Sequence, residues 1–178
     1  MEIKKVITGV LEENCYILSQ DNTCLLIDPG DDSSKIKEAM GNDKLLAVLI
    51  THSHADHIGA LRDFLKNNRR LKVLKKSNLK DEEVVEVGSF KFKVIYTPGH
   101  TKDSITFYFM EEKILFTGDF LFRDTVGRCD LPTGDENEMT ESLKKIKEYD
   151  DDILVYSGHG DETTLGREKE KNLYLMDV

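Results

Sequence analysis

The sequence predicts a mixed α/β (α+β) fold in a single domain, and two observations carry this prediction. Segments with the pattern of strands alternate with segments of helical periodicity along the whole chain, and no linker separates them. A chain of 178 residues is typical of one domain, and it can bury its own core without disulfide bonds. We therefore expect one domain over residues 1–178.

The first third of the chain predicts four strands and two helices. A continuous apolar run over 45–50 is typical of a strand that is buried on both faces. Asp-Pro-Gly at 28–30 ends the preceding strand, because proline and glycine interrupt regular structure. Ser33 or Ser34 can cap the first helix. The expected strands are 4–8, 15–19, 23–27 and 45–50, and the expected helices are 35–40 and 57–67.

The rest of the chain continues the same alternation. Two β-prone segments that meet at 111–112 predict a hairpin. Asp135 stands in capping position before an apolar stripe that runs from Met139 to Tyr149 at helical spacing. A short charged helix is expected after Gly166. The expected strands here are 90–96, 105–110, 113–117 and 153–156.

Composition and charge disfavour several classes of protein. A formal net charge of −9 at pH 7 disfavours wholesale binding to nucleic acids or to anionic membranes. The longest apolar runs fall far short of the about 20 residues of a membrane-spanning helix. The three cysteines, Cys15, Cys24 and Cys129, form no CxxC motif, so we expect free thiols in a reducing cytoplasm. We therefore expect a small-molecule substrate as the partner, with no nucleic acid and no membrane.

The histidines occupy one kind of position. All five lie at turns beside predicted strands, and an aspartate at 119 has the same setting. Ligands of α/β sheets bind at the carboxyl ends of the strands, so these side chains can meet at one site. A lone histidine is more often a surface or capping residue than a ligand, and this reading would suffice for His100 or His159 alone.

The segment Thr51–His57 carries the strongest functional signal, because four ligand-type residues within six positions are rare by chance. In an extended chain, residues i and i+2 point the same way, so one ion can be held by both His52 and His54. Three protein ligands and an open position for water are typical of a catalytic metal site. A carboxylate has two oxygens and can join two ions. The seven candidate ligands are His52, His54, Asp56, His57, His100, Asp119 and His159.

These motifs resemble the metallo-β-lactamase-fold hydrolases. The matching segments are 25–30 (LLIDPG), 51–57 (THSHADH), 97–101 (TPGHT), 117–119 (TGD) and 157–160 (SGHG). The resemblance implies a four-layer αββα sandwich with a pair of metal ions at the edges of the sheets. It implies one ion on His52, His54 and His100, a second ion on Asp56, His57 and His159, and Asp119 as the bridge.

Within that superfamily the chain is most similar to the small glyoxalase II-like branch, through the segments 126–135 and 163–169. This resemblance implies hydrolysis of hydroxyacyl thioesters by a hydroxide that two divalent ions share. Zinc suits the nitrogen and oxygen ligands best, and iron or manganese also fit. Asp56 would orient the hydroxide or move its proton, and Arg128 would contact an anionic acyl-thioester. Cys129, Ala60 and Asp103 depart from the residues that are common in this branch.

Two other functions stay open at this point. Persulfide dioxygenases share the fold and the HxHxDH motif, and they would use one iron on His52, His100 and Asp119. The glycines that flank His159 resemble the hydrolases and favour hydrolysis. A catalytically silent metal-binding module is the third reading, because a fold does not by itself prove activity.

Overall fold

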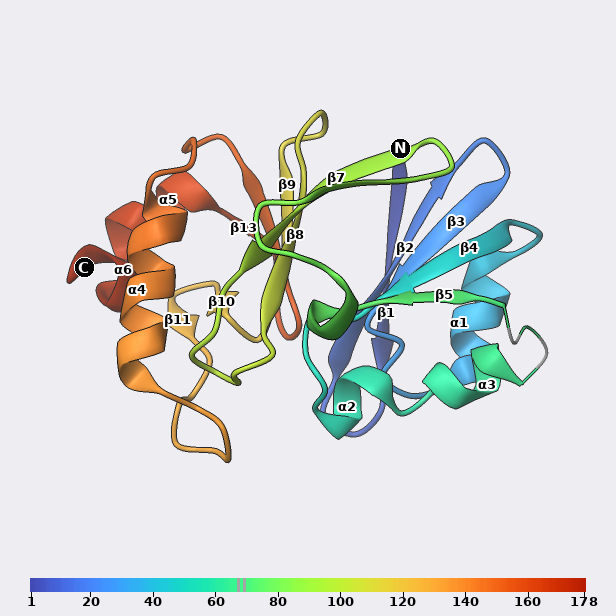
Figure 1. Cartoon of the computed structure of the whole chain (residues 1–178), viewed down its shortest axis with the longest axis horizontal. Coiled ribbons are helices and arrows are strands. Elements are labelled where there is room, and N and C mark those ends of the chain that lie inside the picture. Colours follow the sequence, from blue (N-terminus) through green and yellow to red (C-terminus); the bar gives the residue numbers. More distant parts are fainter. Residues whose placement is uncertain (67, 69) are drawn as a thin grey trace.

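Two β-sheets pack against each other through a shared core, and helices cover their outer faces (Figure 1). The structure is a computed structural model that describes residues 1–66, 68 and 70–178. This arrangement confirms the αββα sandwich that the family resemblance implies. The main covering helices are α1 (Ser33–Met40) and α3 (Leu61–Leu65) on the first sheet, and α4 (Glu136–Lys147), α5 (Leu165–Lys171) and α6 (Leu173–Met176) on the second.

The first sheet holds five strands in chain order. β1 (Glu2–Thr8), β2 (Glu13–Gln20) and β3 (Thr23–Ile27) form an antiparallel meander. β4 (Lys44–Leu49) joins β3 in parallel, and α1 makes the crossover that parallel pairing requires. β5 (Lys72–Leu74) completes the sheet in parallel with β4. The four strands expected in this part of the chain are confirmed, whereas the short β5 was not predicted.

The second sheet holds six strands in the order β13-β12-β9-β8-β7-β6. Neighbouring strands run antiparallel, except that β12 lies parallel to β9 after the crossover through α4. A separate two-stranded ribbon, β10 with β11, follows β9. The bounds are β6 (Val84–Val87), β7 (Phe90–Tyr96), β8 (Ile105–Phe109), β9 (Ile114–Gly118), β10 (Leu121–Phe122), β11 (Thr125–Val126), β12 (Leu154–Ser157) and β13 (Thr163–Thr164).

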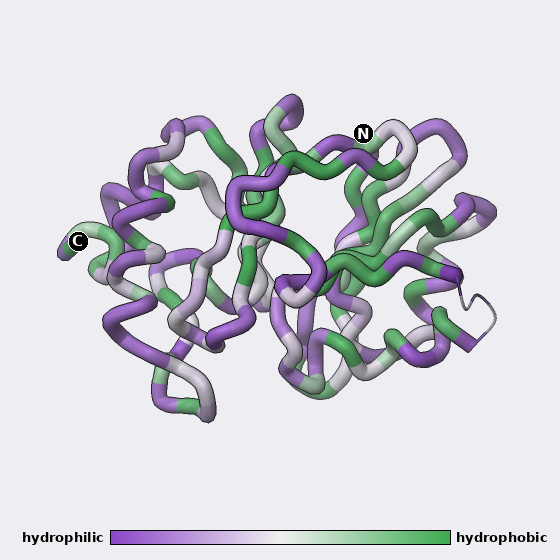
Figure 2. Tube along the Cα trace, in the orientation of Figure 1, coloured by the Kyte–Doolittle hydropathy of each residue, from purple (hydrophilic) through white to green (hydrophobic). Residues whose placement is uncertain are grey.

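The core lies between the two sheets, where hydrophobic residues follow the strands (Figure 2). The aromatic rings of Tyr16 and Phe116 meet edge to face, with 5.1 Å between their centroids. Side chains on the outer faces pack against the helices instead, as strand alternation requires. Cys15 and Cys24 belong to the layer under α1 and are buried free thiols, as the sequence predicts.

The helix predicted over 57–67 is wrong in its extent. The structure has two short helices, α2 (Ala55–Ile58) and α3, and position 67 lies outside the described residues. The amide of Ala60 donates to the carbonyls of Pro29 and Gly30, so it leaves the helical hydrogen-bond pattern. Close packing against the Asp-Pro-Gly turn therefore breaks the helix after α2 and places α2 over the sheet edge.

The predicted serine cap of α1 is also wrong. Asp32 precedes the helix in a left-handed conformation, and its carboxylate accepts a hydrogen bond from the amide of Gly9. Ser33 is the first helical residue and donates to Asp63 on α3. Tertiary contacts thus use the side chains that a local cap would need.

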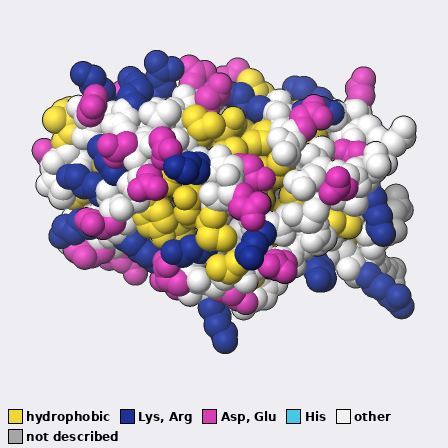
Figure 3. All heavy atoms as spheres, turned by 90° about the horizontal axis from the view of Figure 1, so that it is seen from above, with side chains coloured by type: hydrophobic (Ala, Val, Ile, Leu, Met, Phe, Trp, Pro, Cys, Tyr) yellow, Lys and Arg dark blue, Asp and Glu magenta, His cyan; other side chains and the backbone are white. Residues whose placement is uncertain are grey.

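Charged side chains of both signs cover the face that Figure 3 shows, and the coloured side chains there include no histidine. The histidines lie at the other edge of the sandwich, beside α2. Within the described residues, no helix has both the length and the apolar content to cross a membrane.

Candidate metal centre

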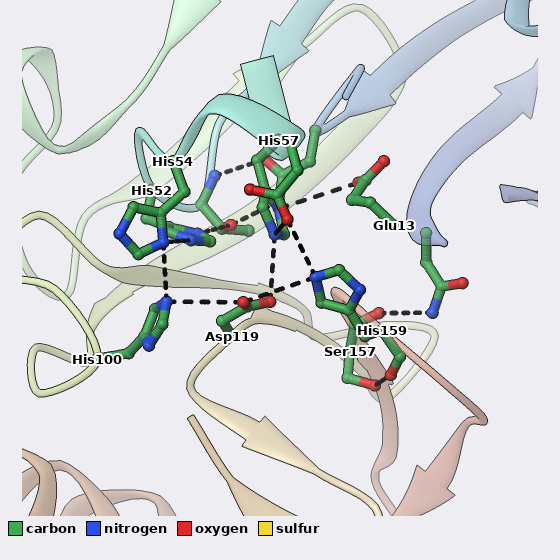
Figure 4. A network of polar contacts seen from close by, with 12 residues as sticks. Glu13, His52, His54, His57, His100, Asp119, Ser157 and His159 are labelled. Atoms are coloured by element: carbon green, nitrogen blue, oxygen red, sulfur yellow. Dashed lines mark hydrogen bonds and ion pairs between the residues drawn. The ribbon is translucent and has the colours of Figure 1, made fainter. Parts of the chain in front are cut away.

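The structure brings all seven predicted ligands together at one edge, where the two sheets meet (Figure 4). The first sheet contributes four of them from the end of β4 and from α2, and the second sheet contributes three from the ends of β7, β9 and β12. Glycine permits the close approach. A Cβ at Gly158 would lie 2.3 Å from Oδ1 of Asp119, so only glycine fits there without a shift.

One group of three nitrogens comes from His52, His54 and His100. Nδ1 of His54 lies 3.1 Å from Nε2 of His52 and 3.0 Å from Nε2 of His100. All three nitrogens lie within 4.8 Å of one another, which is compatible with one shared ion. His52 and His100 are buried, whereas His54 is partly exposed and leaves the group open on one side.

A second group comes from Asp56, His57 and His159. Oδ2 of Asp56 lies 3.9 Å from Nε2 of His57 and 3.3 Å from Nε2 of His159. These ligand atoms also lie within 4.8 Å of one another. Two separate sets of three residues that could each hold a metal ion therefore lie side by side.

Asp119 lies between the two groups. Its Oδ1 is 3.2 Å from Nε2 of His57, and its Oδ2 is 3.6 Å from Nε2 of His100 and 3.7 Å from Nε2 of His159. One carboxylate thus faces ligands of both groups, which is the position a bridging ligand needs.

Two orphaned atoms test whether the site fits metal ions. Nε2 of His57 and Oδ1 of Asp119 are buried and have no hydrogen-bond partner among the residues that the structure describes. Buried polar atoms are nearly always paired, so each unpaired atom calls for an explanation. Both atoms point toward the same gap between the ligand groups, and a divalent ion there would satisfy both. The cluster therefore fits divalent metal ions.

Hydrogen bonds on the far side of the rings hold three of the histidines in place. In each case Nδ1–H donates to an oxygen and leaves Nε2 free to bind, as in most metal-ligating histidines. The bonds run from His57 to Oδ2 of Asp28 (2.9 Å), from His100 to the carbonyl of Arg128 (2.8 Å) and from His159 to the carbonyl of Leu11 (3.0 Å).

The environment shifts the pKa values of several ligands. Burial, and then the charge of His57, lowers the pKa of His52, and burial followed by the charge of His100 lowers that of His54. Burial also acts to lower the pKa of His57, but its close contacts with the carboxylates of Asp119 and Asp28 outweigh burial and raise that pKa. Burial acts to raise the pKa of Asp119, and its contact with His57 outweighs this and lowers it. Because a metal ion binds the neutral imidazole, metal binding at Nε2 of His57 would compete with protonation of that nitrogen.

Three buried residues around the ligands have no role in the sequence prediction. Asp28 appears there only within the turn motif and the matching segment 25–30, and Glu13 and Asn14 only precede the expected strand 15–19. Glu13 lies behind His57, with Oε1 3.9 Å from Nδ1, and burial raises its pKa to about 9. Local sequence carries no signal for these residues, because their partners lie far along the chain.

An open cavity of about 440 Å³ leads to the ligand groups. Leu11, Phe122 and Leu131 provide apolar walls, and Arg128 lies at the same cavity. The guanidinium of Arg128 forms two hydrogen bonds with the carboxylate of Asp130, and both side chains are exposed. Arg128 is thus close enough to meet a substrate, but its charge is already paired.

Comparison with known proteins gives consistent results. A family model described as the metallo-beta-lactamase superfamily matches residues 8–69 and 68–159. Hydroxyacylglutathione hydrolase GloC from Haemophilus influenzae is 31% identical over 98% of this chain and 98% of its own length.

Three solved structures are also similar. A B3 metallo-beta-lactamase named BLEG-1 has a TM-score of 0.92 at 29% identity, covering 98% of this chain and 99% of that one. TTHA1623 in a di-iron-bound form has a TM-score of 0.87 at 30% identity, covering 96% and 99%. ETHE1 from Myxococcus xanthus has a TM-score of 0.88 at 28% identity, covering 97% and 84%. The chain belongs to the metallo-beta-lactamase superfamily, as a metallo-hydrolase of that fold.

Proposed function

We propose that the protein hydrolyses thioesters of hydroxyacyl groups at a dinuclear metal centre. The observation that carries this proposal is the position of Asp119 between two groups of three ligands. The similarity to hydroxyacylglutathione hydrolase GloC supports the choice of a thioester.

In this proposal His52, His54 and His100 hold one divalent ion, and Asp56, His57 and His159 hold the other, with Asp119 in common. Two bound divalent ions supply a hydroxide at neutral pH and polarise a carbonyl group. Asp56 lines the open cavity, so its carboxylate can orient the nucleophile or accept its proton. Water and the thioester give a carboxylic acid and a free thiol.

The lining of the cavity supports a choice of substrate. Its apolar walls suit the chain of an acyl-thiol, and the side chain of Arg128 at the same cavity can approach an anionic group. We therefore propose an anionic acyl-thioester, a small molecule, as the substrate. Zinc is the first choice of metal, and the di-iron form of TTHA1623 keeps iron as a choice alongside manganese.

A persulfide dioxygenase is the second candidate. The similarity to ETHE1 favours it, and His52, His100 and Asp119 could hold a single iron. The unpaired nitrogen of His57 argues for the hydrolase, since a single iron on those three residues would leave that nitrogen and the second group without a metal.

Elemental analysis of the purified protein, combined with two assays, tests the proposal. We expect two metal ions per chain. We also expect hydrolysis of S-lactoylglutathione, which is measured as the release of the free thiol. One iron per chain, with oxygen uptake on glutathione persulfide and no hydrolysis, would instead establish the dioxygenase. Bound metal with neither activity would point to a silent module.

A further inference from the structure

We propose that Asn14 is a positioning residue for the second ligand group, and that it controls the affinity of that group for metal by holding the loop that carries His159. The inference rests on the proposed dinuclear centre. Asn14 lies at the start of β2, in the first sheet, and only 2% of it is exposed. The loop at 157–160 begins with Ser157, the last residue of β12 in the second sheet. One residue thus links the two halves of the site.

Asn14 contacts the loop through three hydrogen bonds. Its side-chain amide donates to the carbonyls of Ser157 (3.1 Å) and Gly160 (2.9 Å). Its backbone amide donates to the carbonyl of Gly158 at 2.7 Å. The remaining carbonyl of the loop, that of His159, accepts from Oγ of Ser157. Asn14 therefore satisfies three of the four carbonyls in this segment.

The loop depends on this support because its own sequence gives it little rigidity. Gly158 and Gly160 flank His159, and Gly160 adopts a φ of +74° with nothing within 4 Å of the place that a Cβ would take. Glycine has more backbone freedom to lose than any other residue. The side chain of His159 is 27% exposed, and beyond the loop its ring is held by the hydrogen bond from Nδ1 to the carbonyl of Leu11. Figure 4 shows His159 and Ser157 together at the side of the site that faces Glu13.

The first ligand group is held by different contacts. Thr51 meets the ring of His52, and the carbonyl of Arg128 accepts from His100. Loss of the Asn14 side chain would leave the carbonyl of Gly160 to an exposed lysine, Lys5, and that of Ser157 to Tyr16 alone. The His159 loop would loosen, while the group of His52, His54 and His100 would keep its contacts.

Zinc titration of the metal-free full chain against a chromophoric chelator tests this inference. We expect wild-type protein to bind two ions, and Asn14→Ala to weaken one dissociation constant by about tenfold or more. The other constant should change by less than about twofold. Asn14→Ser is a milder variant in case Asn14→Ala folds poorly. We expect its weakened zinc dissociation constant to lie between those of the wild-type protein and Asn14→Ala.

A matched control separates positioning from general stability. Asn172 is also fully buried, and its amide donates to the carbonyl of Thr125 and to Glu168. We expect Asn172→Ala to lower the melting temperature while both zinc constants stay at their wild-type values. Double-mutant cycles assign the affected ion. In a His159→Ala background, adding Asn14→Ala should weaken zinc binding little further. In a His54→Ala background, Asn14→Ala should weaken zinc binding by as much as it does in the wild-type protein.

Three results would overturn the inference: both zinc constants weakening together in Asn14→Ala, no change in either, or a wild-type protein that binds a single ion. Thioester turnover plays no part in this measurement. A wild-type protein that binds two ions but does not cleave thioesters would therefore overturn only the proposed substrate.

Discussion

Nδ1 of His57 lies 2.9 Å from Oδ2 of Asp28, and this contact turns the other ring nitrogen toward Asp119. The same carboxylate accepts hydrogen bonds from the amide and the hydroxyl of Thr51, whose hydroxyl lies 3.1 Å from Nδ1 of His52. Asp28 therefore orients one histidine of each ligand group, directly in one case and through a hydroxyl in the other.

Replacing Asp28 with asparagine should weaken the binding of both metal ions. The amide cannot accept at both positions, and the contact that fixes the tautomer of His57 is weakened. Loss of such an outer contact typically costs about 10- to 100-fold in metal affinity. Zinc titration measures the change, and Asp152→Asn is the control, because Asp152 is exposed and, within the described part of the chain, pairs with exposed Lys113 alone. Unchanged affinity in Asp28→Asn would show that Asp28 is not needed for orientation.

Removing a ligand should have a larger effect than removing an outer contact. His54→Ala takes one nitrogen from the first group, and Asp119→Ala takes the carboxylate that both groups share. We expect His54→Ala to lower the bound metal toward one ion, and Asp119→Ala to reduce both. Turnover should fall by more than the about 100-fold typical of an outer contact. Near-normal turnover in either variant, measured with its metal content, would refute the ligand assignment.

The candidate ligands were more predictable from the sequence than the residues that hold them in place. Each candidate ligand lies in the turn or the short helix that follows a β-strand, and this is a local pattern. Asn14 has no such pattern, because its partner Ser157 lies 143 residues further along the chain. Glu13 and Asp28 likewise acquire their roles only in the folded first sheet, where both carboxylates lie beside His57.

The fold shows the same division between local and tertiary causes. Long apolar strands and the stripe of α4 were predicted, because periodicity over many residues is a strong signal. β5 and the two-residue strands β10 and β11 are too short to show any period. The break between α2 and α3 arises from the bonds of the Ala60 amide to the 28–30 turn, which local periodicity cannot report.

Arg128 offers a test of how the substrate is recognised. Its side chain is 64% exposed and already paired with Asp130, so it presents little free charge, and exposed pairs contribute little energy. We expect Arg128→Ala to raise the KM for an anionic thioester by about threefold with kcat unchanged, the signature of a uniform binding contact. Asp130→Asn should free the guanidinium and lower the KM. Steady-state kinetics of both variants test this expectation. An equal fall in kcat and kcat/KM would instead show that Arg128 contacts the substrate only in the transition state.

Gly158 should tolerate no side chain, because the site is built against it. A Cβ there would lie 2.3 Å from Oδ1 of Asp119 and 2.6 Å from Cε1 of His57. Asp28 holds His57 from behind, so the carboxylate of Asp119 must move, and we expect Gly158→Ala to lose at least about tenfold in metal affinity. Gly41 is the control: its φ of +63° strains an alanine by about 1 kcal/mol, but a Cβ there meets nothing within 4 Å. Gly41→Ala should therefore lower the free energy of unfolding and leave both zinc dissociation constants unchanged. If Gly158→Ala bound zinc as tightly as the wild-type protein, Asp119 would not need its present position.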